Sequence, residues 1–129
     1  MFGAGVLDPE KRYELIDGEI IVTPPIGPGS SDFISRLTDF FVRHLPDEFQ
    51  CRIQLPIVVD DHSEPEPDLA IVRRLEAGYV EEHPAPPDVV LLIEVSHSSL
   101  SRDSGQKMEL YATSGIPEYW IVDVERRQL

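Results

Sequence analysis

The stretch that decides the fold is Val89-Val-Leu-Leu-Ile-Glu-Val95, in which only Glu94 is polar. Unbroken apolar runs of this kind belong to strands that are covered on both faces, so this segment is expected to be the central strand of a sheet. Residues 103–114 then hold good helix formers and are followed by Gly115-Ile-Pro117, the usual signature of a helix end. Residues 118–124 (EYWIVDV) resume strand character. Because a helix between two strands makes a crossover connection, the sequence predicts that these two strands are parallel.

The segments before the central strand carry local signals of their own. Residues 13–22 (YELIDGEIIV) place Asp17-Gly18 between two apolar stretches, which predicts a β-hairpin with a two-residue turn. Apolar residues recur with a 3.6-residue period from Phe33 to Leu45 and predict a helix that ends at Pro46. The side chains of residues 30–32 (SSD) are candidate caps for its start.

Two further strands are expected between this helix and the central strand. The first covers residues 53–59, where Pro56 restricts it to an edge or a bulged position. A polar turn over residues 60–67 leads into the second, at residues 68–72. The predicted order is therefore hairpin, helix, strand, strand, strand, helix and strand. We expect an α/β fold of the α+β mixed-sheet type, in one domain over residues 1–129, with two helices flanking the sheet.

Composition limits the classes of function. The chain has 24 acidic and 11 basic side chains and a formal charge of -13, which argues against sequence-blind adhesion to nucleic acid through a broad basic surface. Any contact with DNA must then be local. The single cysteine, Cys51, excludes an internal disulfide, and no apolar run approaches the roughly 20 residues that cross a bilayer. We expect a soluble, unexported cytoplasmic protein that does not bind membranes.

Two acidic residues stand at the ends of predicted strands. Glu94 follows residues that are usually buried, and an ionised carboxylate there is costly unless something compensates its charge. Mg²⁺ would do so, because hard divalent cations select oxygen ligands, but a partner Arg or Lys or a backbone donor would also serve. Asp68 follows Pro67 at the start of the preceding strand, where it is either a turn residue or a second acid beside Glu94.

Lys107 has two interpretations. It lies four residues after Asp103, so the two side chains could form an exposed ion pair on one helix face. Alternatively the helix packs on the central strand and directs the ammonium group at the acids, where it could polarise a water and stabilise a phosphate. Glu14 and Glu19 flank the predicted turn and could add an acid to the same site or remain on the surface.

An ordered set of motifs runs through the chain: Tyr13-Glu-Leu-Ile-Asp-Gly-Glu19, Pro67-Asp68, Glu94-Val-Ser96, Asp103 with Lys107, Tyr111, and Gly115-Ile-Pro-Glu-Tyr-Trp-Ile-Val-Asp123. Together these motifs resemble the Uma-type family of restriction endonucleases, which belongs to the PD-(D/E)XK superfamily. No one motif is specific, but the ordered set is. The resemblance implies a restriction-endonuclease-like core and a metal-dependent endonuclease that hydrolyses DNA phosphodiester bonds with Mg²⁺, or with Mn²⁺ as a substitute.

The resemblance also implies roles for individual residues. Asp68 matches the acid of the PD element and Glu94 matches the (D/E) position, and both would bind the metal together with the backbone carbonyl of Val95. Ser96 stands where the superfamily has its lysine. Lys107 matches the position on the following helix to which this family has moved it.

The N-terminal element also matches the family, and the sequence differs from the family at two places. Glu14 and Glu19 match acids of that element, and the sequence does not choose between them as a catalytic residue. Residues 30–32 stand where family members carry a histidine or a basic residue. Family members also continue past the last strand with further β structure, and an unpaired sheet edge there would favour a homodimer.

Two other functions remain open on the sequence alone. The domain could keep the nuclease fold without the activity and serve as a module that binds nucleic acid or protein, which the acidic balance favours. Alternatively Asp68, Glu94 and Lys107 form a buried structural ion network. Carboxylates that converge on open space would indicate a site, whereas direct salt bridges would indicate the network.

Overall fold

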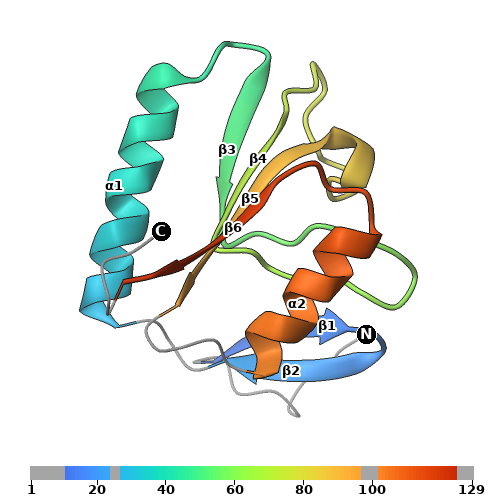
Figure 1. Cartoon of the computed structure of the whole chain (residues 1–129). Coiled ribbons are helices and arrows are strands. Elements are labelled where there is room, and N and C mark those ends of the chain that lie inside the picture. The colour runs from blue at the N-terminus through green and yellow to red at the C-terminus, as the bar shows by residue number, and fades with distance from the viewer. Residues whose placement is uncertain (1–10, 24–26, 97–101, 125–129) are drawn as a thin grey trace.

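The order of helices and strands follows the predicted one. The computed structural model describes residues 11–23, 27–96 and 102–124. Figure 1 shows the elements, which are β1 (Arg12–Ile16), β2 (Glu19–Thr23), α1 (Pro28–His44), β3 (Phe49–Ile53), β4 (Leu69–Arg73), β5 (Val89–Ser96), α2 (Arg102–Thr113) and β6 (Tyr119–Asp123), with a short 3-10 helix at Pro86–Asp88. The expected mixed sheet with two helices and an N-terminal hairpin is confirmed.

The main sheet has four strands in the order β3-β4-β5-β6, and β1 and β2 form a separate two-stranded sheet. β3 pairs antiparallel with β4, and β4 pairs antiparallel with β5. β5 and β6 are parallel, as the crossover through α2 predicts. The stretch of residues 89–95 therefore lies in the interior of the sheet, where Leu91, Leu92 and Ile93 are buried, while Val90 near its start is 37% exposed.

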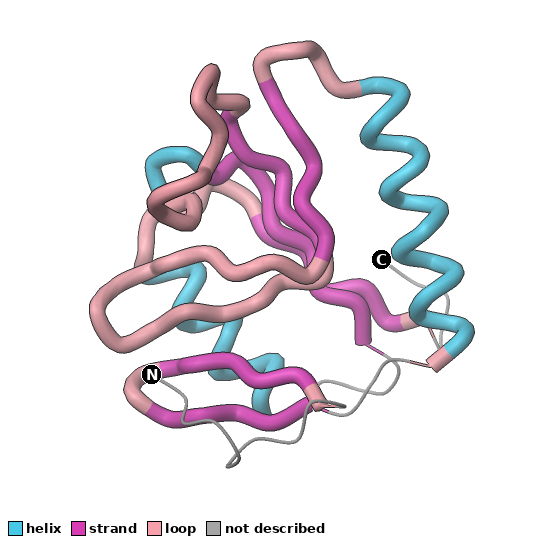
Figure 2. Tube along the Cα trace, turned by 180° about the vertical axis from the view of Figure 1, so that it is seen from behind, coloured by secondary structure: helices cyan, strands magenta, loops and turns pink. Residues whose placement is uncertain are grey.

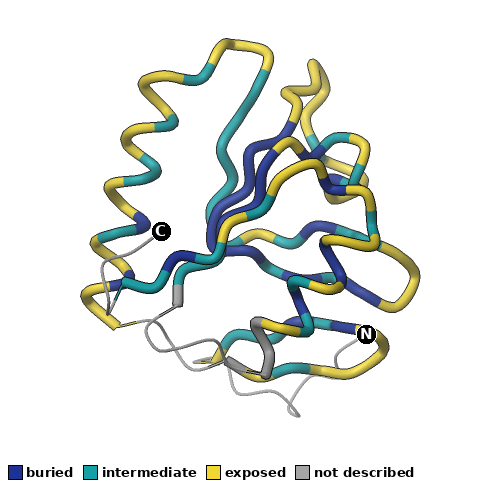
Figure 3. Tube along the Cα trace, viewed as in Figure 1, coloured by how far each residue is buried: buried dark blue, intermediate teal, exposed yellow. Residues whose placement is uncertain are grey.

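The two faces of the sheet carry separate hydrophobic clusters, because successive side chains along a strand point to opposite sides. On one face, Leu69, Ile71 and Ile93 pack with apolar residues of α1. On the other face, Leu92 and its neighbours pack with residues of α2, of the hairpin and of the segment between β3 and β4. The central strands appear as the most buried part of the chain in Figure 3.

The hairpin joins the rest of the molecule through the segment between β3 and β4, which Figure 2 shows as a long loop between hairpin and sheet. Leu15 and Glu64 exchange backbone hydrogen bonds of 3.3 and 2.6 Å, and the Gly18 N–H donates to the His62 carbonyl at 2.8 Å. The turn itself has positive φ at both Asp17 (49°) and Gly18 (81°), the geometry that an Asp-Gly pair favours in two-residue hairpins. This prediction is confirmed.

The first helix begins earlier than predicted. α1 starts at Pro28, with Gly27 as its N-cap and no side-chain cap, so residues 30–32 lie inside the first turns and do not cap the helix. Proline suits this position because its fixed φ is helical and its missing N–H would be unpaired there anyway. Neither α1 nor α2, as far as the structure describes them, is long and apolar enough to cross a membrane.

The expected strand at residues 53–59 is wrong in position. The strand is β3 (Phe49–Ile53), and the chain turns away at Gln54, which has a φ of 53°. Pro56 has no N–H to donate to a sheet, and residues 54–59 run instead toward the hairpin side of the molecule. β3 does lie at an edge of the sheet, the kind of position that a neighbouring proline favours.

We expect Leu92→Ala to lower the free energy of unfolding by about 2–5 kcal/mol, because Leu92 is fully buried at the centre of the sheet. Leu75→Ala removes the same atoms from an exposed loop position and should change the free energy of unfolding by less than about 1 kcal/mol. Urea unfolding followed by circular dichroism measures both variants. If the two variants lost the same free energy of unfolding, Leu92 would not be a core residue as assigned.

Candidate active site

The pairing of β4 with β5 brings Asp68 and Glu94 to the same place. Leu69 pairs with Ile93, so Asp68, which directly precedes β4, stands beside Glu94. Both residues are one position removed from side chains on the α1 face, and they therefore point to the face that α2 covers. The charge of Asp68 is among the causes that raise the pKa of Glu94, after burial as the largest.

Asp68 is buried and accepts hydrogen bonds at both carboxylate oxygens. Its Oδ2 accepts from the backbone N–H of Val95 at 2.7 Å. Its Oδ1 forms an ion pair with Arg12 Nη1 at 3.2 Å and accepts a longer hydrogen bond of 3.4 Å from Gln54 Nε2. The side chain is 7% exposed, so these donors provide most of the compensation for its charge.

Lys107 on α2 bridges two of the acids. Its Nζ lies 2.6 Å from Glu14 Oε1 and 2.7 Å from Glu94 Oε2, and its side chain is 10% exposed. Burial lowers the pKa of Lys107, but the carboxylates of Glu94 and Glu14 raise it, and the net shift is upward. Lys107 therefore stays charged at neutral pH. It can donate hydrogen bonds and stabilise negative charge, but it cannot accept a proton as a base.

Glu94 accepts a second strong hydrogen bond at the same oxygen. The Tyr111 hydroxyl donates to Oε2 at 2.7 Å. Tyr111 lies four residues after Lys107, so both side chains project from one face of α2. Burial is the main cause that raises the pKa of Glu94, Lys107 lowers it, and Asp68 and Glu14 raise it further, for a net upward shift. Tyr111 is fully buried, and its own pKa is raised well above the ordinary value, mainly by burial, so it remains a hydroxyl donor.

The structure distinguishes Glu14 from Glu19. Glu14 is buried on β1, contacts Lys107 and also accepts the backbone N–H of Glu66 at 2.7 Å. Glu19 is exposed on β2 and pairs with Ile16 across the turn. Of the two acids that the sequence left as alternatives, only Glu14 lies at the site.

Several residues at the site escaped the sequence analysis. Arg12 was not singled out, because it directly precedes the predicted hairpin of residues 13–22; extending the alternation of that strand by one residue, which places Arg12 and Glu14 on one face, is the signal that could have found it. Tyr111 was noticed as part of a motif but not as a hydrogen-bond donor. The roles of Gln54 and Glu66 depend on a left-handed turn and on a loop contact, neither of which has a periodic signal.

The three residues predicted as the core of the site are therefore brought together, but not around open space. Lys107 makes direct ion pairs, and Arg12 makes another with Asp68, which is the arrangement that the structural-network alternative expects. The other predicted partner of Lys107 was Asp103, whose side chain lies outside the described part of the chain. Geometry alone thus leaves both a site and a network open.

The side chains of the site can be compared with the ligands that a divalent cation requires. Over residues 11–23, 27–96 and 102–124, no group of three or more His, Cys, Asp or Glu side chains is placed to hold a metal ion. Mg²⁺ commonly takes only one or two carboxylates from a protein and completes its shell with water and substrate oxygens. A carboxylate offers about four acceptor positions, and the donors present leave Asp68 Oδ1 more heavily used than Oδ2, and Glu94 Oε2 more heavily used than Oε1. The chemistry of the two acids therefore suits such an ion.

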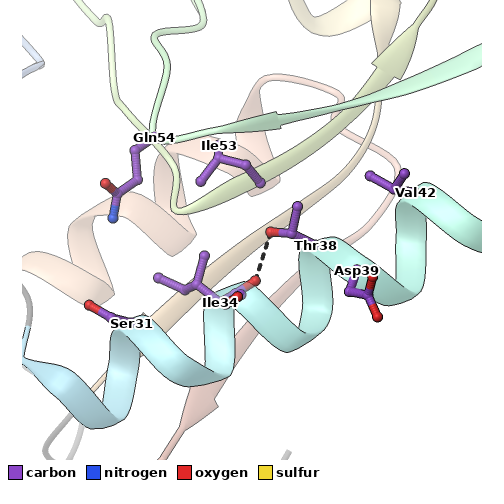
Figure 4. Close-up of a pocket in the computed structure, with 8 residues that line it drawn as sticks. Ser31, Ile34, Thr38, Asp39, Val42, Ile53 and Gln54 are labelled. Atoms are coloured by element: carbon purple, nitrogen blue, oxygen red, sulfur yellow. Dashed lines mark hydrogen bonds between the residues drawn. The ribbon is translucent and has the colours of Figure 1, made fainter.

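A groove of about 540 Å³ adjoins the site between α1 and the end of β3. Figure 4 shows its lining, in which Ile34 and Thr38 of α1 lie on the side of Ile53 and Gln54, whereas Asp39 points away from them. Gln54 connects the groove to the site, since its side-chain amide is also the donor to Asp68. Asp39 is the one charged residue of this lining, so the groove itself offers no cation to a phosphate.

Comparison with known proteins identifies the family of the chain. The profile of the Uma2 family, described as "Putative restriction endonuclease", matches residues 5–129. No curated protein matches the chain significantly. The four-stranded mixed sheet, the two helices and the hairpin are consistent with a restriction-endonuclease-like fold. Since the match covers nearly the entire sequence, this chain belongs to the Uma2 family of restriction-endonuclease-like proteins.

Proposed function

We propose that the protein is a metal-dependent endonuclease that hydrolyses phosphodiester bonds of DNA at a PD-(D/E)XK-type site whose lysine has moved onto α2. The observation that carries the proposal is the placement of Lys107 Nζ 2.7 Å from Glu94 Oε2, with Asp68 on the neighbouring strand. Family membership supports a nuclease, with DNA as the substrate class. The assignment of metal, residues and reaction goes beyond the family and is the proposal.

Asp68 and Glu94 are the proposed ligands of Mg²⁺, or of Mn²⁺ in its place. The backbone carbonyl of Val95 is a third candidate, because the N–H and C=O of one strand residue point to the same side and the N–H donates to Asp68. When bound, the ion would activate water and neutralise charge on the phosphate. Hydrolysis forms a bond from the water oxygen to phosphorus and breaks one ester P–O bond, and the leaving oxygen takes up a proton.

Lys107 has the role of an electrostatic stabiliser in this proposal. The two carboxylates keep it protonated, so its ammonium group can donate to a phosphate oxygen on which negative charge develops. Glu14 forms the second ion pair of Lys107 and is a positioning residue. Tyr111 orients Glu94 in the same way, through the hydrogen bond to Oε2.

A second candidate is an inactive module that keeps the fold and binds nucleic acid or protein. The direct ion pairs at the site and the formal charge of -13 favour it. Buried ion pairs, however, seldom stabilise a fold more than apolar side chains of similar size would. A cluster of this cost is therefore better explained by a chemical role, and metal binding separates the two candidates.

We expect millimolar Mn²⁺ to raise the melting temperature of the protein, because a ligand that binds only the native state stabilises it. At ten times its Kd the ion contributes about 1.4 kcal/mol, which corresponds to roughly 5 °C for a domain of this size. Glu94→Gln should abolish the shift and retain the fold, since Lys107 keeps its contact with Glu14. Differential scanning calorimetry with and without Mn²⁺ measures both effects.

Glu19→Gln is the matched control, because it makes the same change at an exposed carboxylate on β2. It should leave the Mn²⁺ shift intact. If the ion stabilised neither wild type nor control, the inactive module would be the better interpretation.

Lys107→Gln should lower cleavage of plasmid DNA in Mg²⁺ by roughly 10²-fold or more, the loss that follows removal of one electrostatic stabiliser of a transition state. Lys11→Gln changes an exposed lysine and should cleave as wild type does. Because removal of Lys107 leaves two buried carboxylates without their cation, Lys107→Arg is a second variant that retains the charge. Both variants are compared at temperatures where circular dichroism shows them folded. Wild-type cleavage by folded Lys107→Gln would refute the role.

A further inference from the structure

Arg12 holds Asp68 less firmly than Lys107 holds its two acids. Its Nη1 lies 3.2 Å from Asp68 Oδ1, whereas Lys107 Nζ lies within 2.7 Å of both its partners. The Arg12 side chain is 21% exposed, and that of Lys107 is 10% exposed. Of the two cations at the site, Arg12 is therefore the one that can be exchanged.

The guanidinium group of Arg12 is not used in its best geometry. Nη1 contacts Asp68, while Nη2 donates to the backbone carbonyl of Glu66 at 2.8 Å. The planar fork of arginine fits both oxygens of one carboxylate or phosphate with two parallel hydrogen bonds. Here the fork is divided between two acceptors, so a phosphate that offered two oxygens would be a better partner.

The charges around the site favour a divalent cation once Arg12 leaves. Three carboxylates contact the two cations: Asp68 contacts Arg12, and Glu94 and Glu14 contact Lys107. With Arg12 and Lys107 both in place, this group has a formal excess of one negative charge. Without Arg12 the excess is two, which raises the local attraction for a doubly charged ion.

We propose that Arg12 is the counter-ion that a divalent cation displaces from Asp68, and that the released guanidinium group then binds the substrate phosphate. The inference rests on the proposed function, because it assumes that Asp68 is a metal ligand. A guanidinium group and a metal ion repel each other, and Arg12 already contacts Asp68 Oδ1, one of the two oxygens that Asp68 could offer to the ion. Arg12 stays attached to β1 beside the site after displacement, and the adjoining groove supplies no competing cation.

The experiment measures Mn²⁺ alone, by the loss of the free-ion electron paramagnetic resonance signal on binding. Arg12→Ala should bind Mn²⁺ roughly two- to fivefold more tightly than wild type, which is the range that a partly exposed ion pair contributes to an equilibrium. Arg36→Ala is the matched control, because it removes the same charge from an exposed pair with Asp32 on α1. It should leave the Kd for Mn²⁺ unchanged.

A second measurement follows the binding of a short DNA duplex in the presence of Ca²⁺, a divalent cation that also takes oxygen ligands. Arg12→Ala should bind the duplex at least about tenfold more weakly than wild type and Arg36→Ala, as loss of a charge-assisted bidentate contact predicts. Arg12→Lys keeps the positive charge but lacks the planar guanidinium group. Its affinity for the duplex should lie between that of wild type and that of Arg12→Ala. Arg12→Gln serves for the Mn²⁺ measurement if Arg12→Ala is not folded by circular dichroism.

The outcomes separate this inference from the proposed function. Tighter Mn²⁺ binding together with weaker DNA binding supports the exchange. Mn²⁺ binding by wild type that is unchanged or weaker in Arg12→Ala overturns the exchange alone and leaves the nuclease proposal standing. Tighter Mn²⁺ binding with unchanged DNA binding overturns the phosphate role. Failure of every variant and of wild type to bind Mn²⁺ overturns the metal site and the exchange together.

Discussion

The antiparallel register between β4 and β5 is the constraint on which the site depends. The pairing of Leu69 with Ile93 places Asp68 beside Glu94 and turns both toward α2. A slip of one residue would send Asp68 to the α1 face and separate the two carboxylates. The register resists such a slip because both faces of these strands are buried, so a shifted strand would exchange its two sets of side chains between different clusters.

Charge compensation is the second requirement, and it is shared over elements far apart in the sequence. Lys107 and Glu14 are separated by 93 residues, yet their ion pair links α2 to the hairpin. Each acid depends on a donor from another element: Asp68 on the backbone of β5 and Glu94 on two side chains of α2. Each ion pair at the site joins two different elements. Burying such pairs costs desolvation free energy, so they are a poor means of stabilising a fold.

Local signals predicted most of the architecture. The Asp17-Gly18 turn, the apolar run of the central strand and the helix end at Gly115, which has a φ of 84°, all depend on a few adjacent residues and were predicted correctly. The strand β3 was misplaced because the left-handed conformation of Gln54 ends it at Ile53, the first residue of the stretch predicted as a strand. Such a conformation in a residue other than glycine leaves no mark in the hydrophobic pattern.

The candidate site was predicted in part for a similar reason. Asp68, Glu94 and Lys107 were found from strand ends and from an ordered set of motifs, whereas Arg12 was not, because its partners lie more than 50 residues away. The choice between Glu14 and Glu19 depended on which face of the hairpin meets the rest of the molecule. Alternation along a strand separates the two faces but does not say which one is covered.

The attachment of the hairpin has a consequence for how the molecule is assembled. A two-stranded hairpin is marginally stable by itself, and this one docks through a few backbone hydrogen bonds, the buried Ile16 and the two charged side chains that precede it on β1. The four-stranded sheet contains neither strand of the hairpin, so its own strand pairing is complete without it. Asp68 would lose Arg12 and Lys107 would lose Glu14 if the hairpin were undocked, so this small, separately paired element is what finishes the charge balance at the centre of the molecule.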